Sequence, residues 1–341
     1  MSGFSSEYLN TRLSIYASRL ISFEQLVNFI QYDLERIIAA VQELTGHYYQ
    51  LDGAKSNLIE NQLTNRAMDD FLILIRPFSG SERRFFYFAI RWFELANLKV
   101  LIRGKFSGIE SLKIKQELID LGQFADLPIK KLLETDDPYE MLRLLETTPY
   151  AGIVRQARRM YEEHGNDLFL LDATIDRSFF IDLNQRARFL RDQDAQYVSR
   201  VMGGLLDRFN LLWLLRYRFS YGLSAAKSFY LLTTTGNKLY ASELMRLAKM
   251  DSIEEVVAAL PDPYRDLLAN IGVIANMETV MEYYSLSIAA NALHRKSNLL
   301  SRSFAYIMLR EAEVRFLQAL IKGKQLELDP ELIEQAVGAS S

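Results

Sequence analysis

The chain has 341 residues, of which 49% are hydrophobic and 24% charged, ordinary values for a protein that folds around a hydrophobic core. Its formal net charge of −3 argues against binding to nucleic acid phosphates, and its lack of cysteine excludes disulfides and thiolate metal sites. No uncharged apolar run approaches the ~18 residues of a membrane helix, so we expect no transmembrane segment.

Apolar residues recur at three- and four-residue intervals along most of the chain, and no stretch shows the sustained alternation of a β-strand. Only 7 prolines and 16 glycines interrupt this pattern, so the sequence predicts an all-α fold. The clearest predicted helical stretches, in chain order, are residues 23–44, 82–103, 141–161 and 304–321.

One pattern occurs three times along the chain. Residues 94–105 read Glu-Leu-Ala-Asn-Leu-Lys-Val-Leu-Ile-Arg-Gly-Lys, and residues 207–218 and 313–324 repeat the spacing of their charges and leucines. In each copy an acid is followed nine and eleven residues later by two bases. The acids are Glu94, Asp207 and Glu313, and the bases are Arg103 and Lys105, Arg216 and Arg218, and Lys322 and Lys324.

Weaker features keep the same register. Another acid lies about 35 residues before each repeated acid, and each third has a tyrosine after a predicted helix. These residues are Glu60, Asp172 and Glu278, and Tyr48, Tyr150 and Tyr264. The period of about one third of the chain is too long for a solenoid repeat, and each third can bury its own core. We therefore predict three similar helical domains, residues 1–112, 113–222 and 223–341, with approximate threefold symmetry.

The six bases have two interpretations. Each pair lies in the last turn of a predicted helix, where a cation interacts favourably with the helix dipole. Alternatively, three similarly placed basic patches face an acidic or polar partner, which would also explain why the pattern is repeated.

Motifs of catalysis and cofactor binding are absent from the sequence, and the three histidines lack the spacing of metal ligands. The sharpest exception is the acidic cluster Asp136, Asp137 and Glu140, a pattern that binds Mg²⁺ in some helical enzymes. Asp137 before Pro138 is also a typical helix N-cap, and we favour that interpretation. We therefore expect no catalytic, cofactor or metal site.

Several segments carry a family resemblance. Residues 97–105, Asn-Leu-Lys-Val-Leu-Ile-Arg-Gly-Lys, are similar to the N-L-K-x-L-L-R-G-K segment of the C subunits of V-type and archaeal-type ATPases, which are called d subunits in eukaryotic vacuolar enzymes. Residues 8–12, 145–150 and 310–324 resemble further segments of that family, so the resemblance spans nearly the whole chain. Phe316 and Tyr217 depart from the pattern, where an asparagine and a glycine are expected.

The resemblance implies a funnel of three helical domains in the central stalk of a rotary ATPase. Its base would rest on the membrane ring of proteolipid subunits, on the cytoplasmic side, and its hollow would receive the central shaft. The six bases would then face the shaft or brace the funnel, and the chain would transmit torque without catalysis. A helical protein-binding scaffold is the second hypothesis, and a helical Mg²⁺ enzyme is the third.

Overall fold

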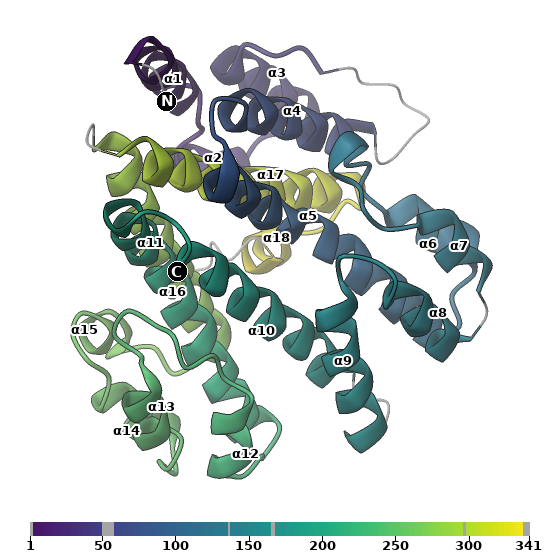
Figure 1. The fold of residues 1–341 in the computed structure, drawn as a ribbon, viewed down its shortest axis with the longest axis vertical. Helices are drawn as coiled ribbons and strands as arrows, with labels where there is room; N and C mark the ends of the chain where they lie inside the picture. Colours follow the sequence, from purple (N-terminus) through teal and green to yellow (C-terminus); the bar gives the residue numbers. More distant parts are fainter. Residues whose placement is uncertain (1–2, 50–57, 136, 165–167, 296–297, 337–341) are drawn as a thin grey trace. The chain divides into compact units, whose positions relative to one another are not determined.

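The computed structural model describes residues 3–49, 58–135, 137–164, 168–295 and 298–336 (Figure 1). These residues form helices and connecting loops, with no strand among them, which confirms the all-α prediction. The chain divides into two compact units, with residues 1–82 and 187–341 in unit 1 and residues 83–186 in unit 2.

Unit 1 is built around one long helix near the end of the sequence. This helix, α17 (Leu299–Gln325), packs against α1 (Gly3–Ala17), α4 (Leu58–Ile75), α11 (Asp192–Leu215) and α16 (Ile274–His294). Helices from the beginning of the chain therefore pack on a helix from its last third. The other elements of the unit are α2 (Phe23–Phe29), α3 (Leu34–Thr45), the π-helix η2 (Arg216–Ser220), α12 (Ala225–Tyr230), α13 (Ala241–Leu247), α14 (Ile253–Ala258), α15 (Tyr264–Leu268) and α18 (Pro330–Ala336).

Unit 2 centres on residues 83–106 of α5 (Gly80–Phe106) and residues 168–186 of α10 (Leu168–Ala187). Aromatic side chains join these two helices: the Phe88 and Phe179 rings stack with centroids 5.1 Å apart, and Trp92 lies against Phe179 and Phe180. Shorter elements complete the unit, namely α6 (Ser111–Glu117), η1 (Gly122–Phe124), α7 (Ile129–Glu134), α8 (Pro138–Leu145) and α9 (Ala151–His164).

Local sequence signals explain where the predicted helical stretches begin and end. Residues 82–103 lie within α5 and residues 304–321 within α17, as predicted. Residues 23–44 form two helices instead of one, because the Asp33 carboxylate accepts the Arg36 N–H at 2.8 Å and starts α3. Residues 141–161 are likewise divided, at Pro149, into α8 and α9.

Candidate functional site

The three repeated acids lie within α5, α11 and α17, and all are buried. Glu94 is 1% exposed, Asp207 0% and Glu313 3%. A carboxylate that is removed from water is strongly destabilised unless hydrogen bonds replace its hydration. In each copy, one or more backbone N–H groups that precede a short helix provide part of this replacement.

The second copy shows the arrangement most completely. Asp207 accepts hydrogen bonds from the backbone N–H groups of Asn237, Lys238 and Leu239, at 2.8 to 3.0 Å, just before α13. The Tyr264 hydroxyl donates to the same carboxylate at 2.7 Å. Burial raises the pKa of Asp207, and these four hydrogen bonds oppose the rise because they favour the charged form.

The first copy repeats this geometry in unit 2. Glu94 accepts the backbone N–H groups of Asp126 and Leu127 at 2.6 and 2.7 Å, just before α7. The Tyr150 hydroxyl donates to its second oxygen. As with Asp207, burial raises the pKa of Glu94 while these hydrogen bonds oppose the rise.

In the third copy the short helix comes from the beginning of the chain. Glu313 accepts the Ile21 N–H at 3.2 Å, just before α2, and the Arg310 guanidinium donates to its other oxygen at 2.6 Å. In all three copies, the acid contacts the N–H of the residue two positions before its short helix: Ile21 for α2, Leu127 for α7 and Leu239 for α13.

Two of the repeated tyrosines bond to a repeated acid, in each case to the acid of the preceding third of the chain. Tyr150 and Tyr264 are the hydrogen-bond donors to Glu94 and Asp207. In the third copy Tyr48 is 71% exposed, whereas its neighbour Tyr49 is 2% exposed and lies near enough to Arg310 to raise the pKa of that guanidinium. The sequence prediction was therefore one residue away from the buried tyrosine.

The base eleven residues after each acid contacts the backbone at, or within three residues of, the other end of the same short helix. Lys105 donates to the Leu133 carbonyl at 2.7 Å, Arg218 to the Met250 carbonyl at 3.0 Å, and Lys324 to the Ile30 carbonyl at 2.6 Å. An acid at the N-terminus and a base at the C-terminus both complement the helix dipole. We call each set a clamp: Glu94, Lys105 and α7; Asp207, Arg218 and α13; Glu313, Lys324 and α2.

The other three predicted bases, Arg103, Arg216 and Lys322, which we call the outer bases, lie differently. Arg103 pairs with Asp172 at 3.3 Å, and Arg216 pairs with Glu278. Both partners are acids that the sequence placed in register with the repeat. In the third copy Lys322 is half-buried. The third acid in register with the repeat, Glu60, contacts the same helix through its backbone, because Gln318 of α17 donates to the Glu60 carbonyl at 3.2 Å.

The structure gives a reason for the Phe316 departure. In the first copy, the Asn97 amide bonds to both the N–H and the carbonyl of Ile119, in the segment that leads to α7. Asn210 likewise accepts the N–H and the hydroxyl of Thr233, before α13. In the third copy α2 follows α1 instead, and Phe316 packs edge-on against Phe23 of α2, with ring centroids 5.8 Å apart.

The glycines of the first and third copies allow close packing by the next helix. A Cβ at Gly104 would lie 2.6 Å from Cγ1 of Ile114 in α6, and a Cβ at Gly323 would lie 2.8 Å from Cγ1 of Ile333 in α18. Tyr217 occupies the corresponding position in the second copy, within η2. The π-helix lengthens the turn there, so that the Leu223 N–H bonds to the Tyr217 carbonyl at 2.8 Å.

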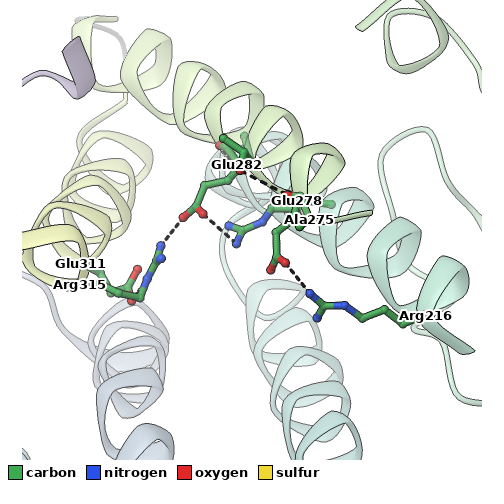
Figure 2. A network of polar contacts seen from close by, with 9 residues as sticks. Arg216, Ala275, Glu278, Glu282, Glu311 and Arg315 are labelled. Carbon is green, nitrogen blue, oxygen red and sulfur yellow. Dashed lines mark hydrogen bonds and ion pairs between the residues drawn. The ribbon is translucent and has the colours of Figure 1, made fainter. Parts of the chain in front are cut away.

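A charged network in unit 1 was only partly visible in the sequence. Glu282 of α16 pairs with Arg208 of α11 at 3.3 Å and with Arg315 of α17, and Glu278 lies one turn away with Arg216 (Figure 2). Burial alone would raise the pKa of Glu282, but the two arginines outweigh it and hold the pKa below its ordinary value. The sequence had singled out Arg216 and Glu278 through the repeat, whereas the only signal for Glu282 was its i,i+4 spacing from Glu278.

The acidic cluster does not form a metal centre among the described residues. Asp137 caps α8, since its carboxylate accepts the Tyr139 N–H at 2.9 Å, and Glu140 pairs with Arg143 at 2.8 Å. Asp136 lies outside the described residues. Within the described parts of the chain, no group of three or more histidine or acidic side chains could hold a metal ion, and no helix is long and apolar enough to cross a membrane.

Comparison with known proteins gives one consistent result. Residues 9–336 match the family model described as ATP synthase (C/AC39) subunit. The chain is 24% identical to the C subunit of the A-type ATP synthase of Methanocaldococcus jannaschii, over 96% of this chain and 84% of the relative. It is 25% identical to the protein of that name from Thermococcus kodakarensis, over 97% and 90%, and 24% identical to that of Haloquadratum walsbyi, over 98% and 99%.

Proposed function

Because the chain belongs to the ATP synthase (C/AC39) subunit family, we propose that it is the central-stalk subunit of a V-type or A-type rotary ATPase. In this role it links the central shaft of the ATPase head to the membrane ring of proteolipid subunits. It transmits torque between them, on the cytoplasmic side of the membrane, and performs no catalysis itself.

The observation that supports this role is the clamp, which occurs three times. A part that transmits torque must resist shear, and each clamp holds a short helix at both ends with buried or partly buried, charge-assisted hydrogen bonds. Such bonds are stronger and more directional than neutral ones. They fix the position of α2, α7 and α13 against the helices that bear the acids.

We also propose that the three copies correspond to three similar domains, residues 1–112, 113–222 and 223–341, arranged as a funnel. The repeat supports three similar parts because each copy has a long helix whose acid and base clamp a short helix. Each clamp joins one proposed domain to another: the first to the second, the second to the third, and the third to the first. The funnel would place the proteolipid ring at its closed base and the shaft in its hollow.

The two groups of bases support two different roles. Lys105, Arg218 and Lys324 brace the fold, because their side chains bond to backbone carbonyls within the clamps. The outer bases end the same helices without clamping a short helix, and we propose that they face the shaft. Of the two outer bases that form ion pairs, Arg103 and Arg216, Arg103 is the more exposed, with 53% of its side chain accessible.

A pull-down of the shaft proteins tests this proposal. Charge reversal at all three outer bases, Arg103→Glu, Arg216→Glu and Lys322→Glu, is expected to weaken binding, and the loss should depend on ionic strength because salt screens the attraction between exposed charges. A neutral triple variant with glutamine separates the loss of attraction from repulsion. Lys249→Glu, an exposed position of unit 1, is the control.

The outcomes are distinguishable. Unchanged affinity in a triple variant that keeps its melting temperature would remove the outer bases from the interface. If the wild-type chain captures neither shaft nor proteolipid proteins, the scaffold hypothesis replaces the rotary one.

A further inference from the structure

A pocket of about 250 Å³ lies in unit 1. Its walls come from α11, from α16, from the loop before α13 and from the first turn of α17. Two arginines line it, Arg200 of α11 and Arg295 just after α16, together with several asparagine side chains. None of the described residues that line the pocket is acidic, in a chain whose net charge is negative.

Neither arginine is used by the fold. Within the described residues, Arg200 and Arg295 form no ion pair and no side-chain hydrogen bond, and both are exposed. Most other arginines near the ends of these helices have partners; Arg208 and Arg216, for example, pair with Glu282 and Glu278. Two guanidinium groups on one pocket make it locally positive, which would favour the binding of an anion.

The pocket is also held open by its surroundings. The Asn298 amide cannot turn inward, because its oxygen accepts the Ser301 N–H at 2.7 Å and its nitrogen donates to Asp194 at 2.6 Å. The opposite wall is fixed by the second clamp, since Asp207 accepts the Asn237 N–H at 3.0 Å. A pocket that exists before its ligand arrives loses little conformational entropy on binding.

We propose that this pocket binds a small anion that carries a phosphate or diphosphate group. Planar guanidinium groups match the oxygens of phosphate, and amide and hydroxyl groups such as those of Asn291 and Tyr197 donate further hydrogen bonds. The volume lies below the ~300 to 1,000 Å³ of pockets for drug-sized ligands, which favours a small ligand over a polypeptide segment.

Titration calorimetry of the full chain with inorganic phosphate and with diphosphate, at constant ionic strength, tests the proposal. We expect saturable binding to one site, weakened about tenfold or more by Arg200→Gln or Arg295→Gln and abolished by both together. Both residues are exposed, so the fold should survive, which thermal melting verifies. Arg188→Gln, an exposed arginine of the same unit outside the pocket, should bind like wild type.

The phosphate group could belong to a free molecule or to a lipid headgroup, and flotation with vesicles separates these sources. Binding to phosphatidic acid vesicles that is absent with pure phosphatidylcholine, and lost in the double variant, would support a lipid source. The proposal is overturned if no phosphate probe binds, if Arg188→Gln weakens binding as much as the pocket variants, or if citrate binds more tightly than diphosphate.

Discussion

The buried carboxylates of this chain differ in what replaces their hydration. Glu94 and Asp207 accept backbone amides and a tyrosine hydroxyl, whereas Asp172 faces the half-exposed Arg103 at 3.3 Å. Its Oδ1 is buried and has no hydrogen-bond partner among the described residues. Burial raises the pKa of Asp172 to about 6, and the positive charges of Arg103 and Lys99 offset only part of this effect. The charged form of Asp172 therefore opposes folding.

This leads to a prediction about pH. The unfolded chain releases the Asp172 proton near pH 4 and the folded chain near pH 6. The stability contributed by the protonated Asp172 is therefore fully present below about pH 4 and is lost as the pH rises through about 6. The loss is at most about 3 kcal/mol. Urea unfolding of the wild type and Asp172→Asn should show that the stability of the wild type relative to the variant falls between pH 4 and pH 7.

The control for this comparison is Glu117→Gln, an exposed acid of the same unit, which should leave the pH dependence unchanged. If Asp172→Asn follows the wild type in parallel across this range, Asp172 is already ionised at low pH and the prediction is wrong.

The acids and bases of the clamps could be predicted from their spacing, but their partners could not. Asp207 bonds to amides about 30 residues later, and a backbone N–H leaves no mark on the sequence. Glu313 bonds to Ile21, 292 residues earlier, which no local pattern suggests. Phe316 was the one clue. It occupies the position of Asn97 and Asn210, and it marks the third copy, whose short helix α2 comes from the beginning of the chain.

The long helices depend on small residues where a second helix packs against them. The Ile114 side chain of α6 packs directly against Gly104 of α5, in space that any side chain at position 104 would occupy. The second copy has Tyr217 instead and a π-helix at this point. The sequence spacing showed the glycine and its replacement by Tyr217, but not the change to a π-helix. A π-helix of five residues is too short for its hydrophobic period to be distinguished from that of an α-helix.

Two helical glycines of unit 2 should therefore respond in opposite ways to alanine. At Gly104 the new Cβ would lie 2.6 and 2.7 Å from Cγ1 and Cδ1 of Ile114, and overpacking should lower the free energy of unfolding by about 1 to 3 kcal/mol. At Gly152 in α9 no atom lies within 4 Å, so alanine should stabilise by up to about 1 kcal/mol through helix propensity. Urea unfolding measures both.

The packing explanation for Gly104 has its own check. Ile114→Ala removes the atoms that the new methyl group meets, so it should cost less in the Gly104→Ala background than in the wild type. Additive effects of the two substitutions would show that the loss at Gly104 does not come from this contact.

Helices that are far apart in the sequence pack together in this chain, beside sequence neighbours such as α16 and α17. Unit 2 joins α5, from the first predicted domain, to α10, from the second. In unit 1, α17 packs on α4 and holds α2 by its acid and its base, so the last third of the sequence is completed by the first. The repeat thus has a cyclic order: α5 and α11 each hold a short helix from the following third of the sequence, and α17 holds a short helix from the first third.

If the clamps act separately, removing one base should loosen only its own short helix. Lys324→Met deletes the hydrogen bond to the Ile30 carbonyl, and amide hydrogen exchange across α2 should become about tenfold faster, while α7 is unchanged. Lys105→Met should loosen α7 and leave α2 unchanged, with a smaller effect because Ser111 still donates to the Leu133 carbonyl at 2.7 Å. Lys249→Met, an exposed lysine of unit 1 outside the clamps, should alter neither helix.

Mass spectrometry of peptides that cover the two helices distinguishes the cases. Equal loosening of both helices by either variant would mean that the clamps unfold as one cooperative unit, and no loosening would mean that apolar packing alone holds the short helices.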